Sequence, residues 1–222
     1  MTEAAGSRLE LALAYVDAVT DSRASLSHAS RVIRDALDEG WGPTELLVEV
    51  LPEALYEIGR RWQDGRASVA DEHLTTSIVQ DTLRELSAAL PRAERRGKSV
   101  LVAAVDGELH AIGPRILADL LEADGWDVLY LGAATPPAAL AQLLEQRNVD
   151  AIALSATLST HLGSLREAVG RVRSGSRPDT YILIGGHACR HLAQPAETIG
   201  ANACELRADA GVMRLAEFAE RR

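Results

Sequence analysis

The sequence is poor in aromatic residues and in cysteine. Its 222 residues include one Phe, four Tyr, three Trp and two cysteines, Cys189 and Cys204, which form no CxxC motif. Two such cysteines do not make a disulfide framework. There is no run of about 18 apolar residues, so no membrane-spanning helix is expected. The polar, partly acidic start MTEAAGSRLE is unlike a signal peptide, and we expect a cytoplasmic protein.

The chain has fewer basic than acidic residues, 23 against 32. The formal net charge is −9, which argues against a dominant basic face and so against direct binding to DNA. The chain has no GxGxxG motif and no set of nucleophile, base and acid, which speaks against an ordinary dehydrogenase or hydrolase. We therefore expect a binding or regulatory protein rather than an enzyme.

Residues 1–90 have the apolar spacing of a helical bundle. Pro52 is predicted to break or kink a helix, leaving a short helix before it and a second one after it. Ser68 followed by Asp71 is a variant of the capping box, and it predicts the start of a helix that runs to about Leu90.

Residues 91–98, which include the basic run RAERRGK, are expected to be a linker, and residues 99–222 form a second domain. Short apolar runs alternate there with helical stretches. Strands are predicted at 99–105, 126–132, 149–156, 180–186 and 201–206, and helices at 112–123, 136–147, 161–173, 190–198 and 209–220. This alternation predicts a flavodoxin-like, Rossmann-like doubly wound sheet of five parallel strands, and the whole chain is α + α/β.

Polar and glycine residues follow three of the predicted strands. These stretches are DGELHAIG at 106–113, SATLSTH at 155–161 and GGHACR at 185–190. Ligands of such sheets bind beyond the carboxyl ends of the strands, near the point where the strand order reverses. Each stretch alone is a weak signal, but all three are expected at one edge of one sheet.

Together these stretches resemble the cobalamin-binding domain, whose motif is Asp-x-His-x-x-Gly, then Ser-x-Leu or Ser-x-Thr, then Gly-Gly. The matching residues are Glu108, Leu109, His110, Ile112 and Gly113, then Ser155 and Thr157, then Gly185 and Gly186. One position departs, because Glu108 stands where the family has aspartate. The resemblance implies that His110 is the lower axial ligand of cobalt. It also implies that the displaced dimethylbenzimidazole tail is buried near Ser155 and the two glycines.

General chemistry agrees with this assignment. A histidine that binds a metal usually donates its other ring N–H to a carboxylate, and Glu108 is two residues away. Gly113 adds little bulk at the start of the next helix, where a ring system could approach closely. Gly185 and Gly186 are expected to leave room for the cofactor tail.

The first half resembles the helical module of CarH-type photoreceptors, which sense light through adenosylcobalamin. The shared features are GRRW and DEHL, with Trp62 followed after nine residues by Glu72 and His73. The resemblance implies that this bundle caps the upper face of the corrin, with Trp62 against the adenosyl group and Glu72 on its ribose. A plain four-helix bundle with Trp62 in its core is the alternative.

Two features depart from CarH-type proteins. We find no helix-turn-helix for DNA, and Gln63 stands where that family has a histidine that captures cobalt after illumination. An amide is a poor cobalt ligand compared with imidazole. The light state is therefore expected to differ.

Three functions stay open at this point. The first is a light sensor that resembles CarH-type proteins or the photocobilins, in which biliverdin accompanies cobalamin. Cys189 and Cys204 are not expected to attach a bilin, so biliverdin would be held without a covalent bond. The second is a corrinoid carrier of a methyltransferase system, and the third is a cobalamin-binding module without photochemistry. A homo-oligomer and a downstream protein partner are expected for the sensor.

Overall fold

The structure is a computed structural model that describes residues 3–20, 26–175 and 179–221. These residues form two compact units, Met1–Leu90 and Pro91–Arg222. Each unit has its own buried core and is described by itself.

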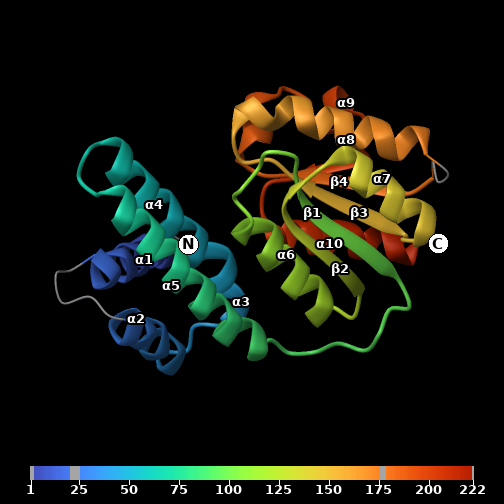
Figure 1. The fold of residues 1–222 in the computed structure, drawn as a ribbon. Coiled ribbons are helices and arrows are strands. Elements are labelled where there is room, and N and C mark those ends of the chain that lie inside the picture. Colours follow the sequence, from blue (N-terminus) through green and yellow to red (C-terminus); the bar gives the residue numbers. More distant parts are fainter. Residues whose placement is uncertain (1–2, 21–25, 176–178, 222) are drawn as a thin grey trace. The chain divides into compact units, whose positions relative to one another are not determined.

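The first unit is entirely helical in its described residues (Figure 1). Its helices are α1 (Glu3–Thr20), α2 (Leu26–Asp38), α3 (Pro43–Glu45), the π-helical turn η1 (Leu46–Val50), α4 (Leu51–Gln63) and α5 (Val69–Ala88). Tyr15 of α1 and Thr82 of α5 are both buried, and their hydroxyl oxygens are 2.8 Å apart. This hydrogen bond satisfies two polar groups that would otherwise destabilise the core.

The prediction at Pro52 is confirmed in part: the short helix α3 and the π-helical turn η1 precede it and α4 begins at Leu51, but helical conformation is not interrupted between Pro43 and Gln63. The π-helical turn lies directly before the proline, and the Leu51 N–H donates to the Leu46 carbonyl, five residues back. A proline lacks an N–H and crowds the carbonyl four residues before it. The wider turn changes the hydrogen-bond spacing at this point, so that the chain passes the proline without leaving the helix.

The turn between α4 and α5 ends with the predicted capping box. The Asp71 N–H donates to the Ser68 side-chain oxygen at 3.2 Å, and the Ser68 N–H donates to the Asp71 carboxylate at 2.7 Å. The two residues thus satisfy each other's backbone donors at the start of α5. The Ser68 hydroxyl also donates to the Asp71 carboxylate at 2.7 Å, and this hydrogen bond, together with that from the Ser68 N–H, lowers the pKa of the Asp71 carboxyl.

The second unit is a sheet of five parallel strands with helices on both faces (Figure 1). The elements are β1 (Ser99–Val105), α6 (Ile112–Ala123), β2 (Asp127–Thr135), α7 (Pro137–Gln146), β3 (Ala151–Ser155), η2 (Ser159–His161), α8 (Leu162–Ser174), β4 (Tyr181–Gly185), η3 (His187–His191), α9 (Pro195–Ile199), β5 (Ala203–Glu205) and α10 (Ala208–Glu220). The strand order is β2-β1-β3-β4-β5, which confirms the flavodoxin-like prediction.

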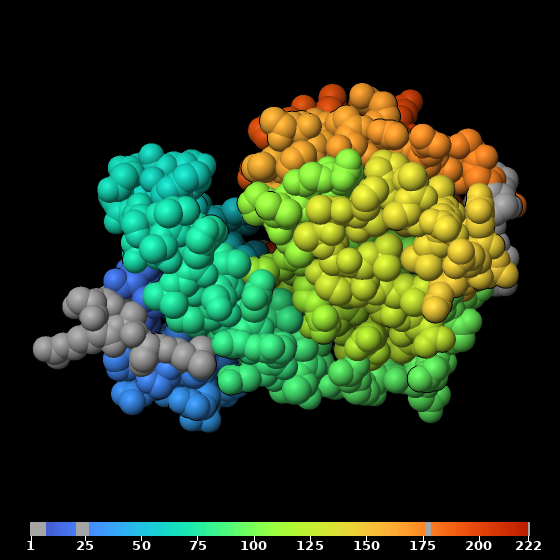
Figure 2. All heavy atoms as spheres, in the orientation of Figure 1, coloured from blue at the N-terminus to red at the C-terminus, as the bar shows by residue number. Residues whose placement is uncertain are grey.

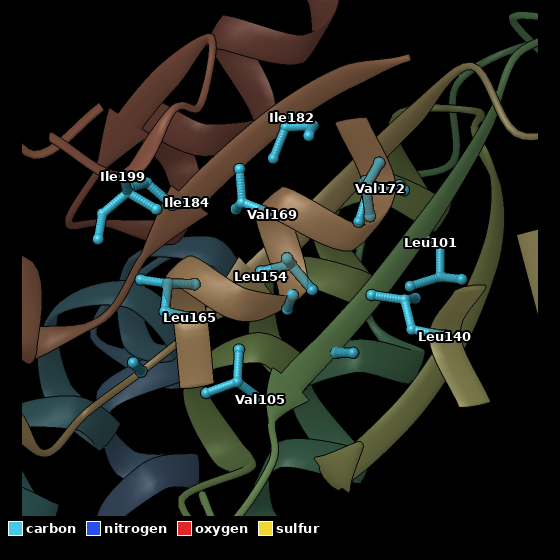
Figure 3. Close-up of a cluster of buried hydrophobic side chains, with 14 of the residues drawn as sticks. Leu101, Val105, Leu140, Leu154, Leu165, Val169, Val172, Ile182, Ile184 and Ile199 are labelled. Carbon is cyan, nitrogen blue, oxygen red and sulfur yellow. The ribbon is translucent and has the colours of Figure 1, made fainter. Parts of the chain in front are cut away.

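Alternate residues of β1 enter two different cores. Leu101 and Val105 pack with residues of α7, α8 and α9, among them Leu165 (Figure 3). Val100 and Val102 pack on the other face, with residues of α6 and α10. In the space-filling view α7, in yellow, and α8, in orange, lie side by side (Figure 2). Burial on both faces explains why the strands read as nearly continuous apolar runs.

Two details of the second unit differ from the prediction. The stretch expected to be one helix at 190–198 is two short helices, η3 and α9, because Pro195 starts a new helix and cannot continue the previous one. Strand β2 extends to Thr135, three residues further than predicted, with irregular pairing to β1.

Residues of the expected linker form hydrogen bonds with the second unit. The Ala93 N–H donates to the Ala123 carbonyl at 2.7 Å, and Arg96 forms an ion pair with Asp124 at 2.8 Å.

Among the described residues, no helix is long and apolar enough to cross a membrane.

The capping box generates a stability prediction. Ser68→Ala should lower the free energy of unfolding by about 1 kcal/mol, since the Asp71 N–H loses its side-chain acceptor. Ser77→Ala, an exposed serine within α5, is the matched control and should cost nothing, because alanine is the better helix former. Chemical denaturation of both variants checks this. Equal losses would contradict a capping role for Ser68.

Candidate cofactor site at the carboxyl edge of the sheet

The motif residues of the second unit meet where the strand order reverses. The connection after β1 leads to β2 on one side of the sheet, and the connection after β3 leads to β4 on the other side, so the loops after β1 and β3 diverge at this edge. Glu108 and His110 follow β1, and Thr157 follows β3. Glu108 contacts both of the other residues.

The Glu108 carboxylate is fully buried and accepts hydrogen bonds on both oxygens. Oε1 accepts from the His110 backbone N–H at 3.0 Å and from His110 Nδ1 at 2.5 Å. Oε2 accepts from the backbone N–H groups of Thr157 and Leu158 at 2.7 and 3.1 Å, and from His161 Nδ1 at 2.9 Å. The longer side chain at the departing position therefore reaches the histidine.

These contacts change the acidity of Glu108. Burial alone would raise the pKa of its carboxyl, since a charge is disfavoured away from water. The hydrogen bonds from His110, His161 and Thr157 outweigh that effect and hold the pKa well below its ordinary value. Glu108 is thus ionised and acts only as an acceptor.

The imidazole of His110 is held by Glu108 and is more than half exposed. Its side chain is 57% exposed although the carboxylate beside it has no exposed surface. Since Glu108 takes a hydrogen from Nδ1, the lone pair of a neutral ring lies on Nε2. The arrangement therefore presents a metal-binding nitrogen with its tautomer already fixed.

Strand β2 fixes the backbone of the same loop on both sides of His110. The Ala134 N–H donates to the Glu108 carbonyl at 2.9 Å, and the Tyr130 hydroxyl donates to the Ala111 carbonyl at 2.9 Å. Ala134 has a φ of +48°, a conformation that is uncommon for a residue other than glycine. These two anchors restrict the movement of the loop that carries the histidine.

His161 and the β2 anchors are the site residues that sequence reasoning did not assign. His161 is the last residue of the stretch SATLSTH that follows the third predicted strand, and the sequence alone assigned it no role of its own. A weak signal was present, because His161 lies on the same predicted edge as His110. No sequence pattern pairs it with Glu108, which is 53 positions away.

Gly185, the last residue of β4, and Gly186, which follows it, both lie close to other backbone segments. A Cβ on Gly186, whose φ is +94°, would lie 2.2 Å from the Ala156 carbonyl oxygen. A Cβ on Gly185 would lie 2.6 Å from the Glu205 carbonyl oxygen. At both positions the absence of a Cβ permits close packing of the protein's own backbone. Gly113 is different, since a Cβ there meets no atom within 4 Å.

Other motif residues lie around this edge. Ser155 is the last residue of β3 and pairs with Gly185 of β4. Ile112 begins α6, directly after the histidine loop. Leu109, Leu158 and Leu206, each beyond the end of a strand, are 76%, 45% and 47% exposed. Exposed leucines along the sheet edge that carries the imidazole suit a ligand with a large apolar face.

The residues singled out in the first unit lie at the α4–α5 connection. Trp62 is 50% exposed and Gln63, the last residue of α4, is also exposed, so the alternative of a core tryptophan is wrong. Glu72 and His73 are in the first turns of α5, and the Glu72 carboxylate is 2.8 Å from His73 Nδ1. Thr76 donates to the other oxygen of Glu72 at 3.0 Å.

The fold and the edge site define a doubly wound domain that binds a ligand through an oriented histidine. The B12 binding domain family model matches residues 98–216, more than half of the chain, and this chain belongs to that family. A second model, also described as a B12 binding domain, matches residues 24–87. The protein is therefore a cobalamin-binding protein.

Known relatives belong to two groups. The chain is 23% identical to trimethylamine corrinoid protein 1 of Methanosarcina acetivorans over 184 residues, covering 81% of this chain and 84% of that protein. It is 29% identical to the HTH-type transcriptional repressor CarH of Myxococcus xanthus over 161 residues, covering 71% of this chain and 53% of CarH. The fold matches the monomethylamine corrinoid protein of Methanosarcina barkeri with a TM-score of 0.75 and 17% identity, over 93% and 95% of the two chains.

The residues at the edge fit cobalamin. His110 has a fixed tautomer and an exposed ring, as a cobalt ligand requires, and the exposed Leu109 beside it in the same loop adds apolar surface. The open space above Gly113 allows a flat macrocycle to approach the start of α6. A separate hollow at the opposite edge, lined in part by Ser99 and Asp127, includes none of the motif residues.

Glu108 generates a prediction about pH. The pKa of its carboxyl is lower in the folded than in the unfolded protein. The ionised carboxylate therefore stabilises the fold fully at any pH above 4.5, the ordinary pKa of glutamate. That stabilisation is lost as the pH falls below 4.5, because the unfolded chain takes up the proton first. Glu108→Gln should be less stable than wild type at pH 7, and the difference should shrink toward pH 3. Urea denaturation across this range measures it.

Glu145→Gln, at an exposed position of α7, is the control for loss of a surface charge. It should show no such convergence with wild type. A constant difference between wild type and Glu108→Gln at every pH would contradict the buried, ionised carboxylate.

The two classes of glycine generate a paired prediction. Gly186→Ala should lower the free energy of unfolding of the apo protein by more than about 1 kcal/mol, because the backbone conformation and the nearby Ala156 carbonyl exclude a Cβ. Gly113→Ala should leave apo stability unchanged or higher, since alanine favours a helix, and should weaken cobalamin binding. Denaturation and cobalamin titration of both variants separate the effects. Unchanged cobalamin affinity in Gly113→Ala would exclude close approach of the ligand there.

Proposed function

We propose that this cobalamin-binding protein is a light sensor that uses adenosylcobalamin. The observation that carries the proposal is the half-exposed Trp62. A tryptophan that serves only the core of a bundle is largely buried, whereas here half of the residue faces outward at the end of α4. Glu72 and His73 follow on the next helix, so that the α4–α5 connection carries an apolar ring beside polar groups.

In this proposal His110 would bind cobalt in place of the benzimidazole base. Glu108 would hold the imidazole ring, and Ser155 and Thr157 would lie near the displaced tail. Gly185 and Gly186 shape the neighbouring turn through their close backbone contacts.

Bound adenosylcobalamin would supply a light-sensitive cobalt–carbon bond. Trp62 would pack on the adenosyl group, Glu72 would accept a hydrogen bond from its ribose, and His73 would belong to the same surface. Gln63 is a weaker ligand than a histidine, so the illuminated protein would hold an easily exchanged upper ligand. The signal would be a rearrangement of the first unit that changes self-association or a contact with a downstream protein.

A second chromophore is part of the same proposal. Biliverdin would be bound without a covalent link, since Cys189 is buried and Cys204 is packed against the same core. The acidic chain would signal through protein contacts, as a homo-oligomer or with a partner, and not by binding DNA itself.

A second candidate function is a corrinoid carrier in a methyltransferase system. The observation that favours it is coverage: the matches to the trimethylamine and monomethylamine corrinoid proteins span most of both chains, whereas the match to CarH spans about half of CarH. A carrier passes a methyl group between partner enzymes and needs no response to light.

Reconstitution with adenosylcobalamin in the dark tests the proposal. Green light should change both the visible spectrum of the protein-bound cofactor and the oligomeric state, and red light should act only when biliverdin is also bound. His110→Ala should bind cobalamin far more weakly. A spectral change without any change in protein conformation or assembly, together with methyl transfer from methylcobalamin, would favour the carrier.

Trp62→Ala tests the assignment of the upper face. Because Trp62 is half exposed, the apo protein should lose less than the roughly 3–5 kcal/mol expected for truncating a core aromatic residue. The variant should no longer prefer adenosylcobalamin to hydroxocobalamin. Tyr56→Ala, at another exposed aromatic residue of α4, is the control and should keep the preference. Thermal unfolding and binding titrations measure both properties.

A further inference from the structure

The Glu108 carboxylate is shared between two imidazoles from different parts of the chain. His110 Nδ1 contacts Oε1 at 2.5 Å, and His161 Nδ1 contacts Oε2 at 2.9 Å. His110 follows β1, while His161 ends the short helix η2 before α8. One negative charge therefore serves two ring N–H donors.

The two carboxylate oxygens of Glu108 accept different numbers of hydrogen bonds. Oε1 accepts two hydrogen bonds, both from His110. Oε2 accepts three, from Thr157, Leu158 and His161. A carboxylate oxygen has about two lone-pair positions, so Oε2 has more donors than lone pairs. Donors concentrate negative charge on the oxygen that they contact, which leaves less of it on the oxygen facing His110.

The position of His161 is fixed independently of His110. Its side chain is 20% exposed, and a Cβ added to Gly107 would lie 3.4 Å from its Nε2, so the ring covers the glycine that precedes Glu108. Because His161 is hydrogen-bonded to the carboxylate that also holds His110, its effect on the cobalt ligand is expected to pass through Glu108.

We propose that His161 is a positioning residue that draws the charge of Glu108 toward Oε2 and so limits how strongly the carboxylate polarises His110. A carboxylate partner raises the basicity of a metal-binding histidine, and a second imidazole on the same carboxylate restrains that effect. This proposal rests on ligation of cobalt by His110 but does not require the response to light.

The test begins with the apo protein. In His161→Ala the Oε1 charge increases, so the hydrogen bond from His110 Nδ1 strengthens and its proton signal should move downfield in the NMR spectrum of histidine-labelled protein. His110→Ala assigns the signal. His161→Asn places an amide N–H near the position of Nδ1 and should restore the wild-type shift. His191→Ala, an exposed histidine elsewhere in this unit, should change nothing.

The sign of the change separates the proposal from a merely structural role. If His161 only held the loop in place, its loss would loosen the His110 hydrogen bond, and the signal would move upfield or broaden by exchange. Either result, or an unchanged signal, overturns the proposal. Thermal denaturation shows whether His161→Ala is folded. If it is not, the His161→Asn variant decides, because the proposal requires this variant to be folded and to have the wild-type chemical shift of the His110 proton.

The bound state gives a second readout. With cobalamin present, His161→Ala should increase the nitrogen coupling from His110 in the electron paramagnetic resonance spectrum of the Co(II) form and move the Co(II)/Co(I) potential to more negative values. If these shifts occur without any light-driven change in assembly, the sensor function fails and the role of His161 stands. If the light response is present and the shifts are absent, only the role of His161 fails.

Discussion

The buried carboxylate of Glu108 is the interaction on which the site depends. It has no exposed surface, and its charge is tolerated because five N–H groups donate to it. Those donors come from the loop after β1 and from the segment after β3, so the carboxylate joins the two connections that diverge at this edge. An uncharged glutamine has the same length but only one acceptor oxygen, so it could not accept hydrogen bonds from both segments and also orient the imidazole of His110.

The sheet supplies the rigidity that this arrangement requires. Strands β1 and β3 pair in regular parallel register up to Ala104 and Ser155, which fixes where their loops begin. Strand β2 pairs irregularly with β1, and two of its residues, Ala134 and Tyr130, anchor the carbonyls of Glu108 and Ala111 in the histidine loop. The unusual backbone conformation of Ala134 occurs at one of these anchors, as is common near functional sites.

The two units carry different functional side chains. The second unit carries the oriented histidine and matches the B12 binding domain family over residues 98–216. The first unit carries an exposed indole beside a turn that is held by a capping box, and an ion pair between Arg61 and Glu57 at 2.8 Å lies just before that tryptophan. A sensor and a methyl carrier can share the oriented histidine of the second unit. The surface around Trp62 in the first unit is therefore where the two functions would differ.

Local patterns in the sequence determined much of this protein. The continuous apolar runs predicted the parallel strands, because both of their faces are buried, and Ser68 with Asp71 predicted the start of α5. The spacing from Glu108 to His110 identified the carboxylate–histidine pair, since two residues of one loop stay close in any fold. Only the tertiary structure brought in His161, which is 53 positions from Glu108, and showed that Gly186 is packed against Ala156. Such contacts depend on strand order and on the path of each crossover, which local residue patterns do not encode.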